Sequence, residues 1–170
     1  LETADVKLRD AGDLQLNHFE CSKPGIKNFE PTLEAISRVQ EAVKGSYGAG
    51  NTPLVVGGDH SIAMGTVSAA YRQFGDDLAV LWIDAHADLH SPYTSPTGNV
   101  HGMPLAASLG EDNAANKMNK PDKDTIDLWN KLKKVGGMSP KINYSDLVFI
   151  SVRDLEPEES FLIKKHKIKM

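Results

Sequence analysis

The stretch that decides the fold is residues 78–88, which read LAVLWIDAHAD. Its first six residues are almost wholly apolar, a pattern typical of a β-strand whose two faces are both covered in a parallel sheet. Directly after them, two aspartates and a histidine alternate with two alanines. The stretch therefore predicts a buried strand that ends at a polar site.

The surrounding sequence predicts further strands and helices in alternation. Residues 53–56 and 147–152 are apolar runs of strand length, and a helix is expected to begin at Pro31 and stop at Gly45. Other helices are expected over residues 63–74, 125–135 and 157–167. Strand, helix and strand within about 30 residues form a βαβ unit with a right-handed crossover. We therefore expect one α/β domain over residues 1–170, a three-layer αβα structure with a mostly parallel sheet.

The composition excludes several classes of protein. The 170 residues are 40% hydrophobic and carry a net charge of -4, as in an ordinary globular domain and unlike a nucleic-acid-binding surface. No apolar run approaches the roughly 18–20 residues of a membrane span, and no signal peptide opens the chain. The single cysteine, Cys21, favours a reducing compartment, so we expect a cytoplasmic protein without nucleic-acid or membrane partners.

The polar residues after the strand point to a metal site. In an extended chain, residues two apart project to the same side, so Asp84, His86 and Asp88 should converge. His60 follows the preceding predicted strand and should reach the same sheet edge, where ligands bind in open α/β folds. Imidazole and carboxylate ligands without cysteine favour Mn²⁺, with Zn²⁺, Co²⁺, Ni²⁺ or Fe²⁺ as alternatives. A hydrogen-bonded turn that merely terminates the strand is the competing interpretation.

Four short motifs together resemble the ureohydrolases, a family that includes arginase, agmatinase and formimidoylglutamase. Residues 57–61 (GGDHS) and 84–88 (DAHAD) resemble the first two metal motifs of that family. Residues 95–102 (SPTGNVHG) resemble the substrate loop of arginase, and residues 153–159 (RDLEPEE) resemble the arginase segment that holds the substrate amino group. The similarity runs from about Asp5 to Met170 and narrows to arginase.

The resemblance implies hydrolysis of L-arginine to L-ornithine and urea by a hydroxide that bridges two Mn²⁺ ions, in a homo-oligomer that is a trimer or a hexamer. The implied metal ligands are His60, Asp84, His86 and Asp88, with Asp84 bridging. The implied catalytic residues are His101, which suits proton transfer to the departing amine, and Asp88. The implied substrate-binding residues are His90, Thr97, Asn99, Asp154 and Glu156.

The sequence also departs from the family pattern. His90 stands where arginases usually carry Asn, Thr97 replaces a usual Ser, and Glu156 replaces a usual Asp. A later Asp-x-Asp-x-x-Asp-Pro motif, which completes the metal pair in the family, is absent, as is a later acid expected to hold the guanidinium. We therefore expect an incomplete chain with about half of the site, inactive in isolation. The alternatives are an agmatinase or other ureohydrolase, and a non-catalytic metal-binding or interaction module.

Overall fold

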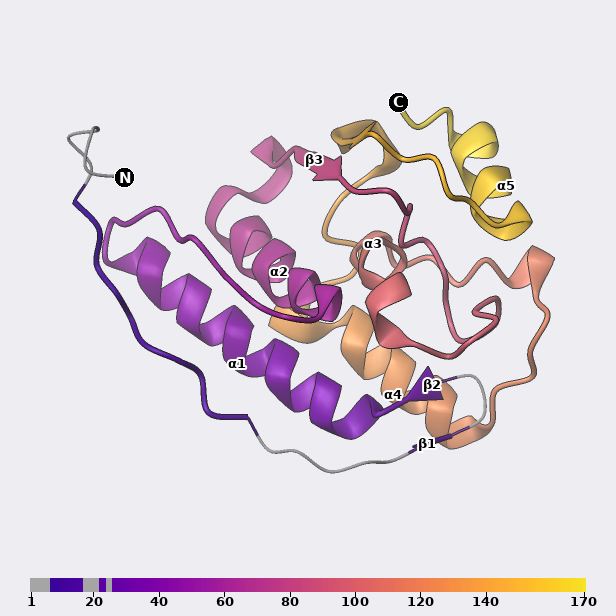
Figure 1. Cartoon of the computed structure of the whole chain (residues 1–170), viewed down its shortest axis with the longest axis horizontal. Coiled ribbons are helices and arrows are strands. Elements are labelled where there is room, and N and C mark those ends of the chain that lie inside the picture. The colour runs from indigo at the N-terminus through magenta and orange to yellow at the C-terminus, as the bar shows by residue number, and fades with distance from the viewer. Residues whose placement is uncertain (1–6, 17–21, 24–25) are drawn as a thin grey trace.

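The computed structural model describes residues 7–16, 22–23 and 26–170, and Figure 1 shows how the elements are arranged. Cys21 and Asp5, which entered the sequence analysis, lie outside the described residues. Residues 7–16 form neither helix nor strand, and the first elements are a short antiparallel pair, β1 (Ser22–Lys23) and β2 (Ile26–Lys27). None of the described helices combines the length and apolarity that crossing a membrane requires.

The helices follow the apolar periodicity of the sequence. Their bounds are α1 (Phe29–Gly48), α2 (Ala63–Phe74), α3 (Pro104–Leu109), α4 (Lys123–Lys133) and α5 (Pro157–His166). The helix predicted over residues 63–74 is confirmed with both ends correct, whereas α1 continues three residues beyond the predicted stop at Gly45. Helices α1 and α2 lie side by side (Figure 1), and a Cβ at Gly65 would stand only 2.7 Å from the Ile36 carbonyl oxygen. Glycine therefore permits the close approach of these helices.

The sheet is a parallel pair, which confirms the predicted α/β class. Strand β3 (Val80–Ile83) pairs with β4 (Leu147–Ile150), with Trp82 opposite Phe149. Beyond β4, Lys169 forms an isolated parallel bridge with Val148. Trp82 and Phe149 are buried on one face of the sheet, in a core that includes residues from α2, α3 and α5.

The other face of the sheet differs from the prediction that both faces are covered. Leu81 is 64% exposed, Ile83 is 71% exposed and Ile150 is 40% exposed. Side chains alternate between the two faces of a strand, so these residues lie opposite the core face. Within the described residues, β3 and β4 are therefore covered only on the face that carries Trp82 and Phe149, and no helix packs on the opposite face.

The strand predicted over residues 53–56 is wrong for the described structure. These residues form no β-bridge with any described segment, and Leu54 and Val56 are 81% and 88% exposed. An apolar run becomes a strand only when a neighbouring strand pairs with its hydrogen-bonding groups, and no described strand, β3 included, pairs with this segment. The helix and the second strand of the predicted βαβ unit are present, and its first strand is not.

Candidate metal centre

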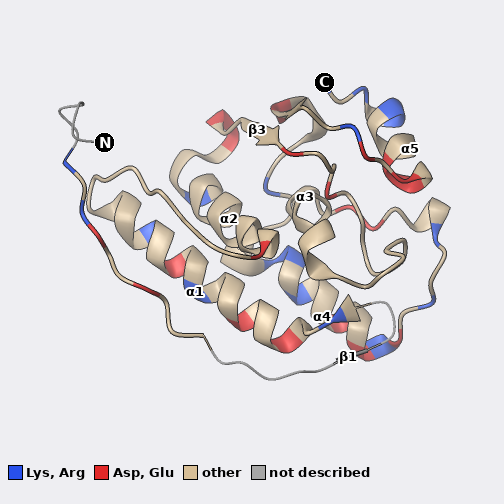
Figure 2. Ribbon diagram, in the orientation of Figure 1, with Lys and Arg blue, Asp and Glu red and all other residues tan. Residues whose placement is uncertain are grey.

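The site is built at the edge of the sheet where β3 and β4 end. The Asp84 N–H donates to the Ile150 carbonyl oxygen at 3.2 Å, which extends the pairing by one residue. One residue later, the Ala85 carbonyl oxygen accepts the N–H groups of both Arg153 and Asp154 at 2.9 Å. These bonds hold the segments after the two strands together. Figure 2 shows acidic residues on both segments and at the start of α5.

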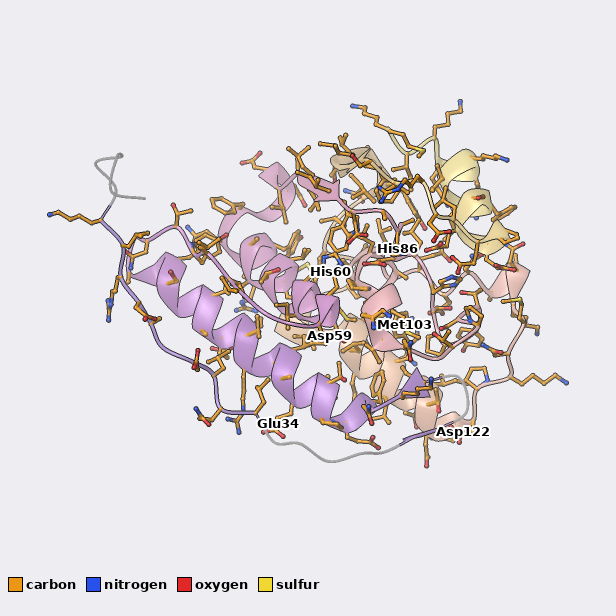
Figure 3. All side chains as sticks on the ribbon, viewed as in Figure 1. Glu34, Asp59, His60, His86, Met103 and Asp122 are labelled. Carbon is orange, nitrogen blue, oxygen red and sulfur yellow. The ribbon has the colours of Figure 1, made fainter. Side chains whose placement is uncertain are left out.

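His60 reaches this edge from the start of α2. The Asp59 carboxylate accepts the Ser61 N–H at 2.9 Å and so caps a short 3₁₀ turn, His60–Ile62, that leads into α2. The imidazole of His60 stacks on the buried indole of Trp82, with ring centroids 4.5 Å apart. Figure 3 shows His60 and His86 at the junction of α2, α3 and the chain after β3. A core residue of the sheet thus fixes the orientation of a candidate ligand.

Three candidate ligands converge here. The His60 Nδ1 lies 3.2 Å from Asp84 Oδ2 and 3.0 Å from Asp88 Oδ2, and one ligand atom from each residue lies within 4.8 Å of the others. The Asp88 side chain is 7% exposed, and its Oδ2 is buried without a well-aligned hydrogen bond from any described residue. Buried carboxylate oxygens normally have such partners, so this oxygen is suited to a cation.

The charges of the cluster influence one another. The close Asp88 carboxylate raises the pKa of His60 above its usual value, against the opposing effect of burial. Burial raises the pKa of Asp84, but the His86 N–H and the nearby His60 outweigh it, so that the pKa of Asp84 lies below its usual value. A carboxylate that stays ionised is what a metal ligand requires.

The extended geometry predicted for residues 84–88 is wrong. Residues 84–86 form a bend, in which Asp84 Oδ1 accepts the His86 N–H at 2.9 Å, and Asp88 has a left-handed backbone with φ of 51°. The Asp88 carbonyl oxygen accepts the N–H groups of Leu105 and Ala106 at the start of α3, which holds this unusual conformation. The hydrogen-bonded turn, which was the competing interpretation of this motif, is therefore present. Asp84 and Asp88 nevertheless converge with His60.

His86 lies at the side of this cluster. Its Nδ1 is 3.2 Å from Asp84 Oδ1, its Nε2 is 3.7 Å from Asp154 Oδ2, and its side chain is 58% exposed. Because the backbone bends at residues 84–86, the side chains of His86 and Asp88 do not converge. The structure therefore brings together three of the four predicted ligands and leaves His86 in contact with only one of them, Asp84.

A second group forms where α5 begins. His90 Nε2 lies 3.3 Å from Glu156 Oε2 and 3.8 Å from Glu159 Oε2. Glu159 is anchored, because it accepts the Leu89 N–H at 3.0 Å and the Glu156 N–H at 3.3 Å. Burial and the adjacent Glu156 carboxylate raise the pKa of Glu159 to about 8. Glu159 was not among the predicted site residues, and the signal in the sequence that could have found it is its capping-box spacing from Glu156.

The remaining predicted residues lie farther along the loop. His101 Nδ1 is 3.5 Å from Asp59 Oδ2, a contact that the sequence analysis did not anticipate. The Lys27 ammonium donates a hydrogen bond to Asn99 Oδ1 at 3.2 Å. The Asn99 N–H donates one to the Thr97 hydroxyl oxygen at 3.2 Å. Among the described residues, no hydrogen bond or ion pair joins these side chains to His90 or Glu156. The loop reaches His90 through the Gly102 carbonyl oxygen, which accepts the His90 N–H at 3.1 Å.

Comparison with known proteins places this geometry in a family. The model of the arginase family matches residues 1–170, which is the whole chain. The chain belongs to the arginase family. Its fold is also that of solved members: an arginase from Bacillus subtilis superposes with a TM-score of 0.79 at 34% identity, covering 94% of this chain and 49% of that one.

Curated arginases agree with this assignment. The arginase of Bacillus caldovelox is 36% identical over all of this chain and 52% of its own length. The hepatic arginase of Aquarana catesbeiana is 34% identical over 99% of this chain and 49% of its own length. This arginase-family chain thus spans about half the length of the curated relatives it matches.

Proposed function

We propose that the complete protein hydrolyses L-arginine to L-ornithine and urea with two Mn²⁺ ions, and that this chain supplies part of the metal site. The observation that carries the proposal is the convergence of His60, Asp84 and Asp88 at the edge of the sheet. Membership of the arginase family over the whole chain supports it. We further propose a homo-oligomer, a trimer or a hexamer, and a cytoplasmic location, on the family resemblance and the single cysteine.

The residues present fit a divalent cation. The His60 Nδ1 lies 3.2 Å from an Asp84 oxygen and 3.0 Å from an Asp88 oxygen. These three atoms can bind one ion at bond lengths of about 2.0–2.2 Å. The buried Asp88 Oδ2 would gain the partner that the described protein atoms do not give it. Oxygen-rich sites favour Mn²⁺ over softer ions. We assign His60, Asp84 and Asp88 as ligands and propose that His86 joins them by rotating its exposed side chain.

The protein residues around this centre would bind the guanidinium and move a proton. When bound, the metal pair would lower the pKa of a water molecule and so supply a nucleophile near neutral pH. Asp88 would keep its carboxylate turned to the centre and so help to hold the cationic guanidinium. His101 would donate a proton to the departing amine, with its Nδ1 side oriented by Asp59 at 3.5 Å.

The amino-acid head of the substrate would lie between the loop and α5. Asp154, which lies 3.7 Å from His86, and Glu156, which lies 3.3 Å from His90, would attract the α-ammonium group. The Thr97 hydroxyl and the Asn99 amide NH2 would donate hydrogen bonds to the α-carboxylate, beside the positive charge of Lys27. A carboxylate is favoured next to a lysine ammonium because opposite charges attract.

Urea release from arginine tests the proposal directly. The complete protein, loaded with Mn²⁺, should release urea and ornithine in equal amounts. An Asp88→Asn variant should lose most of its activity together with bound metal, since Asn offers no negative charge. A Glu158→Gln variant serves as the control, because Glu158 is an acidic residue in the first turn of α5 and is not one of the three convergent ligands. Retention of full activity in Asp88→Asn would remove the metal centre from the mechanism.

A further inference from the structure

We propose that His90, Glu156 and Glu159 form a second binding site for a divalent transition-metal cation, separate from the candidate metal centre. These residues offer one imidazole nitrogen and two carboxylate oxygens within 4.8 Å of one another. The imidazole of His90 is a common type of ligand for such a cation, and carboxylates complete the set.

An unpartnered buried nitrogen points into the site. His90 is 6% exposed, and its Nε2 makes no hydrogen bond with any described residue although two carboxylates lie near it. Its other ring nitrogen, Nδ1, lies 3.1 Å from the Thr94 hydroxyl oxygen. When Nδ1 carries the proton and donates it to Thr94, the Nε2 lone pair faces the carboxylates. A cation between them removes that repulsion, and the Thr94 bond fixes the ring as such bonds do in metal sites.

The spacing of the three groups selects the size of the cation. Around a tetrahedral ion with bonds of about 2.0–2.1 Å, ligand atoms stand about 3.3–3.4 Å apart. The observed separations from His90 Nε2, 3.3 Å to Glu156 and 3.8 Å to Glu159, are close to that value. An ammonium group with hydrogen bonds of about 2.9 Å holds its acceptors about 4.7 Å apart. The arrangement as it stands therefore fits a metal ion better than an ammonium group.

The ligands are also held in place. Glu159 is 2% exposed and receives the N–H groups of Leu89 and Glu156, so its carboxylate cannot turn away without losing both bonds. Glu156 is the exposed partner, and its half-exposed side chain leaves a path from solvent. A site with two fixed ligands and one exposed ligand can bind a cation without rearrangement of the fold.

Cation binding here would have a functional consequence that rests on the proposed function. Glu156 and His90 are assigned to the amino-acid head of arginine, so the metal ion and the substrate would compete for them. Zn²⁺ should then raise the KM for arginine while changing kcat little.

A metal count on three forms of the complete protein tests the proposal. Each form is loaded with Mn²⁺, exposed to Zn²⁺, passed through a desalting column and analysed for both metals. The wild type should retain one Zn²⁺ per chain more than His90→Asn, at equal Mn²⁺ content. His166→Asn is the matched control, because His166 Nε2 is also buried without a hydrogen bond among the described residues but its ring stacks on Tyr144. That variant should bind zinc as the wild type does.

A milder change keeps the test decisive if His90→Asn folds poorly. Glu156→Gln alters a half-exposed side chain and should weaken Zn²⁺ binding at least about tenfold, as judged by calorimetry. Equal zinc retention in the wild type and His90→Asn, or unchanged zinc affinity in Glu156→Gln, would overturn the proposal. The metal count does not depend on turnover, so it decides the cation site even if arginine is not hydrolysed. Loss of urea release alone would overturn only the proposed function.

Discussion

The imidazole of His60 lies on the indole of Trp82 with the two ring planes only 18° apart. Trp82 belongs to the core face of β3 and is 5% exposed, whereas His60 lies in the turn before α2. The packed core therefore sets the orientation of a residue at the site. Preorganisation of this kind reduces the entropy that a ligand loses when it binds a metal ion.

Replacing Trp82 by Leu should weaken Mn²⁺ binding by about 10–100-fold, the range seen when residues that support a metal ligand are changed. The leucine fills part of the core but leaves the His60 ring free to turn. Trp82→Phe should retain most of the affinity because it keeps an aromatic face. Free Mn²⁺ measured by electron paramagnetic resonance gives the affinities directly.

Trp129 provides the control for loss of stability. It is also buried, but its indole N–H donates to Asp112 at 2.7 Å and it lies in a different apolar cluster. Trp129→Leu should destabilise the fold by a few kcal/mol, as large core truncations do, without a specific change in metal affinity. Equal weakening of Mn²⁺ binding in both leucine variants would show that Trp82 acts only through stability.

Replacing His101 by Asn should lower kcat of the complete protein while its metal content stays the same. General acid–base groups contribute about 10²–10⁴ in rate, and His101 lies apart from the three convergent ligands. Turnover and elemental analysis are measured on the same samples. Parallel loss of metal and activity would make His101 a ligand or a scaffold residue.

Asp59→Asn should give a smaller decrease in kcat than His101→Asn. Asp59 lies 3.5 Å from His101 and orients it, while its hydrogen bond to Ser61 also caps the turn that carries His60. The amide can keep the cap but loses the negative charge beside the imidazole. A shift in the pH dependence of kcat separates this role from a structural one, which would change only stability.

The complete protein should prefer arginine to agmatine. Asn99 and Glu156 match groups that recognise the amino-acid head, and agmatine lacks its carboxylate. A site built to hydrogen-bond a substrate group can reject an analogue without that group by up to about 10⁴–10⁵. The ratio of the two kcat/KM values is the measurement, with His90→Asn as a variant that removes the imidazole beside Glu156. Comparable values for both substrates would favour an agmatinase or a broad ureohydrolase.

The sequence predicted what depends on local pattern. Helix α2 was predicted to the residue because its apolar spacing and the glycine after Phe74 are local signals. The strand predicted over residues 53–56 failed because pairing depends on a neighbour that no local pattern reveals. The exposed Leu81 and Ile83 show the same limit, since an apolar side chain does not specify what covers it.

The candidate site shows a similar division. The alternation in residues 84–88 singled out Asp84 and Asp88, which converge with His60, but it could not show the Asp84–His86 turn or the left-handed backbone of Asp88. The hydrogen bonds from α3 to the Asp88 carbonyl, which stabilise that backbone, come from residues distant in sequence. The residue types of the candidate site could be predicted from the sequence, whereas their arrangement depends on tertiary contacts.

The stability of the metal-free protein should decrease as pH rises from about 4.5 to 8. Burial raises the pKa of Glu159 from 4.5 to about 8, so in this range the folded state keeps a proton that the unfolded state has released. A state that binds more protons is favoured at low pH, and the effect levels off above the folded pKa. Glu159→Gln should flatten this dependence, measured by urea unfolding with a chelator present. Glu158→Gln should leave it unchanged; the same slope in all three forms would assign it to other groups.

The 170-residue chain in isolation should bind Mn²⁺ weakly and release negligible urea from arginine. Three convergent ligands carry two carboxylate charges, against the four positive charges of two Mn²⁺ ions, and the chain spans about half the length of its relatives. The sheet face that exposes Leu81, Ile83 and Ile150 should also promote self-association, because exposed apolar patches and strand edges attract further chains. Calorimetric titration with Mn²⁺, a urea assay and light scattering together test these expectations. Two tightly bound ions with turnover near that of a complete arginase would show that the residues of this chain suffice for the site.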